Sequence, residues 1–287
     1  MIHIVAPGRR AVALYRNPAY SPNQHRSNDT LILDVTVARL AARGWGIERA
    51  DEGDIAAGRV PASDWYLNMC QGPAASEALA LAVGPDAVLV NAPGSVLNCH
   101  RHRMAPALRA AGVPFPETEV ISSNDEPAAA ARRISDGDAT ALIWVKRGDV
   151  HAQTSDDVLR VAMDEVAAVV TAFRARGIER VALQRHVPGP VIKFYAVNRG
   201  RFFRWFVTAS GTPLSATPDE RRLQQVVFAA ADALGLEVFG GDVVLSAPDT
   251  PVLVDINDWP SFAPCRHDAA EAIASYVDTQ VPRGERS

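Results

Sequence analysis

The sequence has few lysines, no excess of positive charge and no long apolar run. Among its 29 basic residues, only Lys146 and Lys193 are lysines, and the formal net charge is −4. This balance argues against a nucleic-acid partner that is bound by neutralising phosphates. No apolar run reaches the length that a bilayer requires, which argues against a membrane partner. The two lysines that remain therefore need an explanation of their own.

Cysteine is also scarce. Cys70, Cys99 and Cys265 are odd in number and show no C-x-x-C spacing, so we expect ordinary buried thiols in a reducing compartment. The start, MIHIVAPGRR, lacks the basic lead, apolar segment and cleavage site of a secretory signal. These absences together predict a cytoplasmic protein.

What is present is typical of a globular chain with two domains or lobes. It has 287 residues, of which 48% are apolar and 22% are charged. Strand and helix patterns alternate in residues 1–94, beginning with a strand at 2–6, and predict an α/β domain with a parallel sheet. No G-x-G-x-x-G follows that strand, so a dinucleotide fingerprint is missing. A composition change near 188–190 predicts a second boundary, which gives lobes at 95–187 and 188–287.

Within these lobes, longer elements are predicted from periodicity and from glycine or proline. Residues 95–111 predict one helix that links the first domain to the small lobe, and residues 156–177 predict one long helix closed by Gly177. Residues 191–208 predict an antiparallel hairpin that turns at 198–200.

The run VLVDINDWPSF (252–262) combines an apolar strand pattern with polar groups. Side chains alternate along a strand, so Leu253, Asp255 and Asn257 should share one face. A carboxylate without a partner is costly to bury, so something should hold Asp255 there. The alternative is a half-exposed strand with a solvated polar face.

The preceding run VFGGDVVL can pair with this strand as a hairpin. If Leu245 lies opposite Val252, then Asp242 lies opposite Asp255 and the two carboxylates repel unless a cation lies between them. Two carboxylates and the Asn257 amide oxygen suit magnesium or manganese. The alternative is that these groups bind backbone or arginines instead.

Both lysines lie in strand-like apolar runs. Lys146 should share a face with Trp144, and Lys193 with Tyr195. A lysine is a compact charge on a flexible stem, which suits contact with a phosphate oxygen. Two such residues near a magnesium site would form a cradle for a nucleotide triphosphate. The alternative is that each extends from a strand end to water; the scarcity of lysine elsewhere favours function.

The order of these motifs resembles the ATP-grasp superfamily over roughly residues 90–280, and within it the carboxylate–amine ligases of the ribosomal-protein glutamate ligase type. The segments that carry the resemblance are NAPGSVLNCHRHRMAPALRAAGVPFPET, WVKRGD, VALQRHVPGPVIKFYAV, and GGDVVL with LVDINDWPSF. The resemblance implies an ATP-grasp fold of α/β class, with residues 1–94 as the α/β domain that precedes it.

The resemblance also implies roles for individual residues. ATP would be bound by Arg101, Lys146, His151, Gln184, Arg185, His186, Val187 and Lys193. In this set, Lys146 and Arg101 would contact phosphates, residues 184–187 would form the hinge that holds adenine, and Lys193 would reach the γ-phosphate or an acyl phosphate. Asp242, Asp255 and Asn257 would hold one or two Mg²⁺ ions, or Mn²⁺.

The sequence departs from the family pattern in three places. The loop RGDVHAQTS has a single glycine where the family has a glycine-rich phosphate loop, so His151, Thr154 or Ser155 would do part of its work. The hinge has Gln184 where a glutamate is common. Asp255 stands where many members have glutamate, and Asp-Ile-Asn occurs in the inositol phosphate kinase branch.

The resemblance therefore implies an ATP-dependent ligase that joins a small-molecule or peptide carboxylate to an amine, or to a thiol, through an acyl phosphate. Lys193, Arg204 and Arg266 are the candidate catalytic residues, although arginines such as Arg201 and Arg204 are more often solvated. One alternative is a small-molecule kinase on the same scaffold, and another is a nucleotide-binding protein without turnover. The sequence names neither substrate and is compatible with a homo-oligomer.

Overall fold

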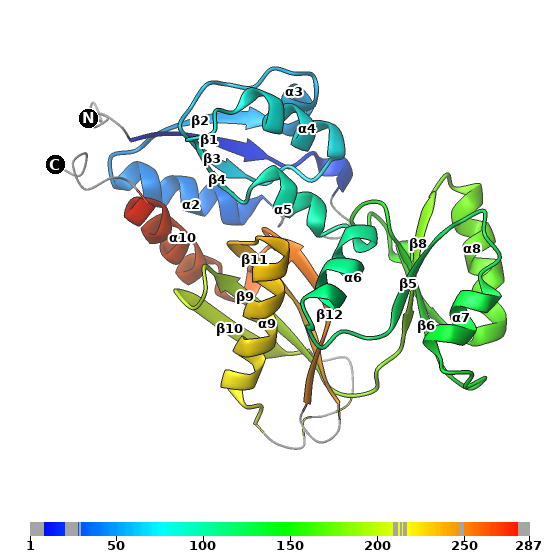
Figure 1. Cartoon of the computed structure of the whole chain (residues 1–287). Coiled ribbons are helices and arrows are strands. Elements are labelled where there is room, and N and C mark those ends of the chain that lie inside the picture. Colours follow the sequence, from blue (N-terminus) through cyan, green and yellow to red (C-terminus); the bar gives the residue numbers. More distant parts are fainter. Residues whose placement is uncertain are drawn as a thin grey trace.

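The computed structural model describes residues 9–20, 28, 30–208, 212, 214, 217–246 and 250–280. Within that part of the chain the strands form three sheets of four, each with its own helices (Figure 1). The strand predicted at residues 2–6 lies outside the described residues. None of the described helices is long and apolar enough to cross a membrane.

The first sheet is parallel, as predicted. Its order is β2-β1-β3-β4, formed by β1 (Arg10–Tyr15), β2 (Gly46–Asp51), β3 (Trp65–Asn68) and β4 (Val88–Val90). The connecting helices are α2 (Leu31–Ala42), α3 (Glu52–Ala56) and α4 (Pro73–Ala82). Alternate residues of β1 are buried in separate apolar clusters, Ala11 and Ala13 in one and Val12 and Leu14 in the other, so both faces of the sheet are covered.

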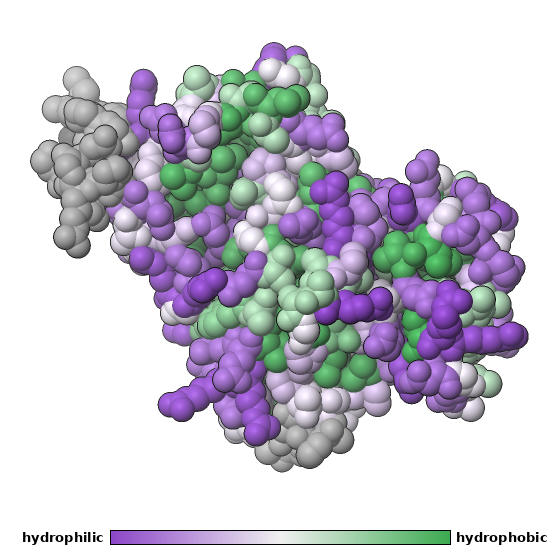
Figure 2. Space-filling model, in the orientation of Figure 1, coloured by the Kyte–Doolittle hydropathy of each residue, from purple (hydrophilic) through white to green (hydrophobic). Residues whose placement is uncertain are grey.

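The second sheet is antiparallel, in the order β5-β8-β6-β7. Its strands are β5 (Thr118–Ser122), β6 (Ile143–Arg147), β7 (Val158–Val161) and β8 (Arg180–Arg185). Helices α7 (Ala128–Ile134) and α8 (Val166–Ala175) pack on one face around a buried cluster that includes Ile134, Val170 and Phe173. Hydrophilic side chains surround the outer edge of this lobe on the face that Figure 2 shows.

The third sheet is also antiparallel, in the order β10-β9-β11-β12. Its strands are β9 (Val191–Val197), β10 (Phe202–Val207), β11 (Val238–Ser246) and β12 (Thr250–Asp258). The remaining helices are α5 (Pro93–Asn98), α6 (Arg101–Ala110), α9 (Glu220–Leu234) and α10 (Arg266–Gln280). α6 and α9 cover one face, whereas α10 lies between the other face and α2, so α10 packs the third sheet against the first domain (Figure 1).

Two predicted helices are wrong in extent. Residues 95–111 form two helices, α5 and α6, because the chain turns at His100, whose backbone is extended (ψ 131°). The first part of 156–177 is strand β7, since Val158, Leu159 and Val161 pair with the open edge of β6 and the helix begins only at Val166. The predicted hairpin is confirmed as β9 and β10.

The pairing of β11 with β12 is regular except for a bulge at Val254. Asp242 lies opposite Asp255, as predicted, but Leu245 lies opposite Pro251 instead of Val252. The extra residue absorbs the difference of one position. The bulge also places the side chains of Leu253 and Asp255 on different faces of the sheet. Leu253 is fully buried in the core, so the prediction that it shares a face with Asp255 is wrong.

Candidate functional site

The site is centred on the two carboxylates that β11 and β12 present opposite each other. Asp242 is flanked on β9 by Lys193, whose Nζ lies 3.5 Å from Asp242 Oδ1. Asp255 is held from α6 by Arg101, with Nη2 2.7 Å from Oδ2. Each carboxylate is therefore paired with a cation that belongs to a different element.

These surroundings shift the two acids in opposite directions. Burial and the charge of Asp255 raise the pKa of Asp242, although Lys193 opposes the shift. Burial also raises the pKa of Asp255, but the charges of Arg101 and Lys146 outweigh it and its pKa is lowered. Asp255 is thus held as an anion, whereas Asp242 is harder to ionise unless a further cation binds next to it.

The donors present fit a hard divalent cation. Asp242, Asp255 and Asn257 all line the same cavity and offer only carboxylate and amide oxygens, the ligands that Mg²⁺ prefers. A bound cation would offset the repulsion from Asp255, which adds to the effect of burial on the pKa of Asp242. Among the described residues, no group of three or more His, Cys, Asp or Glu side chains could hold a metal, so the third oxygen would come from the Asn257 amide.

Lys146 lies on β6 and points into the centre from the second sheet. Only 6% of the residue is exposed, and its Nζ donates to Gln184 Oε1 at 2.6 Å and to the Val254 carbonyl at 3.3 Å. Burial lowers the pKa of Lys146 to about 8. The ammonium is therefore poorly solvated, a condition under which an anionic ligand is attracted strongly.

A cavity of about 890 Å³ separates the second and third sheets. Its lining includes the predicted nucleotide residues Lys146, Gln184, Arg185, His186, Val187 and Lys193, together with both acids of the pair. Trp144 adds an aromatic wall, and its Nε1 donates to His186 Nδ1 at 3.2 Å. The volume is within the range of cavities that bind cofactors and drug-sized ligands.

A smaller cavity of about 260 Å³ lies on the other side of the pair, toward the first domain. Lys193, Asp242 and Asp255 line both cavities, so the two meet at the carboxylates. Gly240 and Gly241 line only the smaller one, where a Cβ at Gly241 would overlap the Asp255 carbonyl. The absence of side chains at these two positions keeps strand β11 close to β12 and the cavity open.

Two predicted nucleotide residues line the smaller cavity and not the larger one. Arg101 lies there with Asp255, and its Nη1 also donates to the Arg147 carbonyl at 3.1 Å. His151 lies there with its Nε2 3.2 Å from Asp258 Oδ1. Their roles toward ATP stay predictions.

The glycine-poor loop between β6 and β7 is held in shape by carboxylates. Asp157 Oδ2 accepts hydrogen bonds from the backbone N–H groups of Gln153 and Thr154, at 2.7 and 3.1 Å. Asp149 Oδ1 accepts from the Val150 N–H at 2.9 Å. These backbone N–H groups are therefore already hydrogen-bonded. A phosphate would have to bind another part of the loop or displace the carboxylates from these N–H groups.

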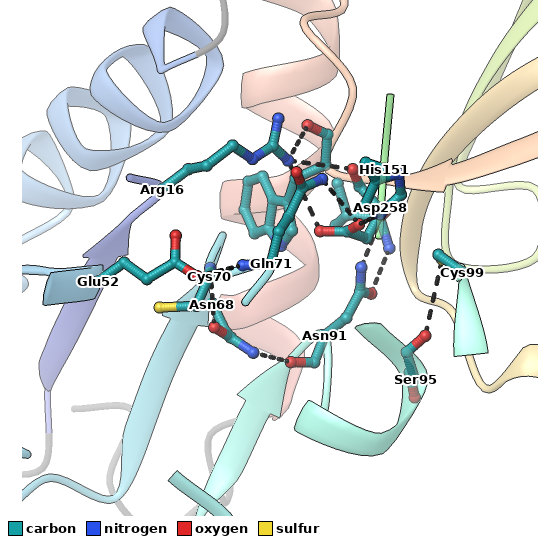
Figure 3. A network of polar contacts seen from close by, with 12 residues as sticks. Arg16, Glu52, Asn68, Cys70, Gln71, Asn91, Ser95, Cys99, His151 and Asp258 are labelled. Atoms are coloured by element: carbon teal, nitrogen blue, oxygen red, sulfur yellow. Dashed lines mark hydrogen bonds and ion pairs between the residues drawn. The ribbon is translucent and has the colours of Figure 1, made fainter. Parts of the chain in front are cut away.

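Asp258, the last residue of β12, connects all three lobes (Figure 3). Its Oδ1 accepts a hydrogen bond from Gln71 Nε2 at 3.1 Å, and Arg16 Nη2 lies 3.6 Å from its Oδ2. Burial raises the pKa of this carboxyl, but His151 and Arg16 outweigh burial and lower it. Asp258 is thus an anion, although only 1% of the residue is exposed.

Gln71 is itself positioned by Glu52. Glu52 Oε1 accepts from the backbone N–H groups of Gln71 and Gly72, and its Oε2 accepts from that of Asn17. Burial raises the pKa of Glu52, against the effect of these hydrogen bonds. A single carboxylate therefore ties the loop after β3 to the segment after β1.

Sequence reasoning missed Arg16, Glu52, Gln71 and Asp258. Asp258 directly follows Asp-Ile-Asn, so its position could have drawn notice. Arg16 and Gln71 come from loops of the first domain and Glu52 begins α3, and none of the three belongs to a motif.

The candidate catalytic arginines lie away from both cavity linings. Arg204 is exposed, donates to the Phe203 carbonyl at 2.9 Å and stacks 5.2 Å from the Phe202 ring centre. Arg266 Nε donates at 3.3 Å to the carbonyl of Ser261, which lines the smaller cavity. Neither contacts the carboxylate pair in the described part of the chain, and their catalytic roles stay predictions.

No protein-family model and no curated protein matches this sequence. Solved structures do match, over nearly the whole chain. The D-alanine-D-alanine ligase from Coxiella burnetii is 15% identical, with 94% of this chain and 96% of that chain covered and a TM-score of 0.67. VanG D-Ala:D-Ser ligase from Enterococcus faecalis is 12% identical, with 96% and 100% covered and a TM-score of 0.69.

A RimK-domain ATP-grasp protein from Sphaerobacter thermophilus DSM 20745 is 20% identical, with 93% of this chain and 98% of that chain covered and a TM-score of 0.65. At such identities the likeness is one of fold. The chain has the ATP-grasp fold, and the fold predicted from its sequence is confirmed.

Proposed function

We propose that this chain is an ATP-dependent carboxylate–amine ligase. The observation that carries the proposal is the meeting of a cavity of about 890 Å³ and a cavity of about 260 Å³ at Asp242 and Asp255. ATP occupies the larger one, and the substrates enter the smaller one. The names of the similar structures, D-alanine-D-alanine ligase and D-Ala:D-Ser ligase, support this type of reaction.

In the first step a substrate carboxylate oxygen attacks the γ-phosphorus of ATP, so that ADP leaves and an acyl phosphate forms. In the second step an amine nitrogen attacks the acyl carbon, so that the C–O bond to phosphate breaks, an amide forms and the amine releases a proton. Positioning and electrostatic stabilisation supply most of the catalysis in such phosphoryl transfers.

The residues of this chain have distinct tasks in that scheme. Residues 184–187 hold the base, with Trp144 as the cavity wall beside it. Lys146 exchanges its contact with Gln184 for a phosphate oxygen, a stronger partner because it is charged. Lys193, with 45% of its side chain exposed, is free to turn from Asp242 toward the transferring group.

Asp242, Asp255 and Asn257 would hold Mg²⁺, which supplies the positive charge that offsets the transferring phosphoryl group. With the cation bound, the charge of Asp255 would be offset without Arg101, whose guanidinium could then contact a phosphate. Arg266, adjacent to the small cavity through Ser261, is the better placed of the two candidate catalytic arginines to meet a substrate carboxylate.

We propose a small molecule or a peptide end as the carboxylate substrate. A reducing, cytoplasmic setting is part of the proposal and agrees with free thiols at Cys70, Cys99 and Cys265.

The test is to incubate the protein with Mg-ATP and a pool of small carboxylic acids and amines, and to measure ADP and free phosphate together. Asp255→Asn, which keeps the shape but removes a charge of the pair, is the matched control. Equal amounts of ADP and phosphate that require the pool and Asp255 support the ligase, and mass spectrometry then identifies the amide.

ADP without free phosphate would instead identify a kinase. ATP binding without either product, across pools of increasing breadth, would favour a nucleotide-binding protein without turnover.

A further inference from the structure

Two buried acceptor atoms at the small cavity lack hydrogen-bond donors. Within the described part of the chain, neither Gln71 Oε1 nor Asp258 Oδ2 has a hydrogen-bond partner. Only 3% of Gln71 and 1% of Asp258 are exposed, and both residues line the small cavity. Buried acceptors without donors are rare and unfavourable, which points to a ligand that supplies the missing donors.

The orientation of the Gln71 amide follows from its other contacts. Its Nε2 donates to Asp258 Oδ1 at 3.1 Å, so Oε1 is the amide atom left for a ligand. Glu52 holds the backbone of Gln71, and Arg16 lies 3.6 Å from Asp258 Oδ2 and offsets its charge. The two acceptors are therefore fixed in place before any ligand arrives (Figure 3).

We propose that Gln71 Oε1 and Asp258 Oδ2 bind the two N–H groups of a primary amine, which is the acceptor substrate of this chain. The inference rests on the proposed ligase function and gives the chemical class of the second substrate. A neutral primary amine has two N–H donors and one lone pair. When both donors are bound, the lone pair remains for attack on the acyl carbon.

Other nucleophiles satisfy this site less well. A thiol, a hydroxyl or a secondary amine offers one donor hydrogen and leaves one of the two acceptors buried without a partner. Sites built to hydrogen-bond a substrate N–H discriminate strongly against analogues that lack it. The acceptors also line the same cavity as Asp255 and Lys193, so the bound amine is adjacent to the proposed acyl transfer.

The kinetic test uses O-methylhydroxylamine, which has two N–H donors, and N,O-dimethylhydroxylamine, which has one; neither has an O–H donor. Both are supplied with Mg-ATP and a pool of the common amino acids as carboxylates, and the O-methyl hydroxamates are measured by mass spectrometry. The wild type should prefer O-methylhydroxylamine. Gln71→Met should raise the KM for O-methylhydroxylamine by roughly tenfold to a hundredfold, leave the KM for ATP unchanged and abolish most of that preference.

Ser76→Ala is the matched control. Among the described residues, Ser76 Oγ also has no hydrogen-bond partner and is buried, but it lies on α4 and does not line the cavity. Its removal should leave the preference intact. If Gln71→Met slows both nucleophiles equally, its effect is structural and the inference is wrong. If the wild type forms no hydroxamate at all, the proposed function fails with this pool and the binding test below decides the inference.

The binding test needs no turnover. The side-chain NH₂ signal of Gln71 is assigned in NMR spectra by its absence from Gln71→Met, and is followed during titration with methylammonium and with tetramethylammonium. Methylammonium has N–H donors and should shift the signal; tetramethylammonium has the same charge without donors and should not. Equal shifts with both ions, or no shift with either, would overturn the inference.

Discussion

The two cavities on either side of Asp242 and Asp255 are built in different ways. The larger one is formed by the second and third sheets, and most of the residues that line it lie on β6–β9, β11 and β12 and in the 184–187 hinge. The smaller one takes residues from the first domain, the loop after β6 and the end of β12. The first therefore needs only the two lobes that contain residues 144–255, whereas the second also needs residues of the first domain.

The difference has a functional meaning. Under the proposed function, the larger cavity binds ATP, which does not change with the carboxylate or the amine, so its site can depend on a few fixed motifs. The acceptor differs from one reaction to the next, and loops of a separate domain can change without disturbing the nucleotide site. The chemistry specific to this chain should therefore be sought around Gln71 and Asp258.

Asp255→Asn is expected to have the largest effect, because Asp255 lines both cavities. It removes a charge that both cavities share, so turnover should fall by roughly a hundredfold to a thousandfold. The measurement is ADP release under saturating Mg-ATP, with circular dichroism as the check on folding. Asp232→Asn, on the exposed side of α9, should retain activity. A fully active Asp255→Asn would remove the basis for the metal assignment.

The larger cavity is tested alone by Lys146→Met. Loss of a charged donor to phosphate should raise the Kd for ATP by roughly tenfold to a hundredfold. The same change removes a buried charge, so the free energy of unfolding at pH 7 should rise by about 1–2 kcal/mol. Isothermal titration calorimetry and urea unfolding provide the two measurements. Unchanged ATP affinity would place the phosphates elsewhere.

The pH dependence of ATP binding and of stability in the wild type provides a second test of the role of Lys146. Burial lowers the pKa of Lys146 to about 8 from 10.5, so the ammonium is lost as pH rises through 8 and ATP should bind more weakly above that pH. Between about pH 8 and 10.5 the unfolded chain binds the proton and the folded chain does not, so this residue's destabilising effect should diminish as pH rises. Lys146→Met should show neither dependence.

The smallest effect is expected at Arg204, which lines neither cavity. Arg204→Ala should change kcat by less than about twofold, in line with the weak contribution of exposed arginines. Steady-state kinetics at saturating ATP provide the measurement. A loss of tenfold or more would mean that β10 moves toward the site during the reaction and would restore Arg204 as a catalytic candidate.

Much of the larger cavity was predictable because strand patterns and motif order specify it. The opposition of Asp242 and Asp255 was predicted correctly, and so was the face that Lys146 shares with Trp144. The boundary between strand and helix at 158–161 was not, because an apolar run with this spacing fits either element until the open edge of β6 is known. Pairing partners decide such cases, and they lie outside the segment.

The smaller cavity was beyond prediction for a different reason. Arg16, Gln71 and Asp258 are far apart in the chain and meet only through the packing of separate lobes. Each residue alone resembles an ordinary polar side chain in a loop. Their proposed role follows from burial and from acceptor atoms of Gln71 and Asp258 that have no hydrogen-bond partner in the described part of the chain, which are properties of the folded structure alone.

The bulge at Val254 makes part of the site robust to mutation. Without the extra residue, β12 would pair regularly with β11 and Asp255 would still lie opposite Asp242. What the extra residue adds is a main-chain carbonyl that accepts from Lys146. No exchange of one side chain for another at position 254 deletes that oxygen, so only a change in chain length can remove it.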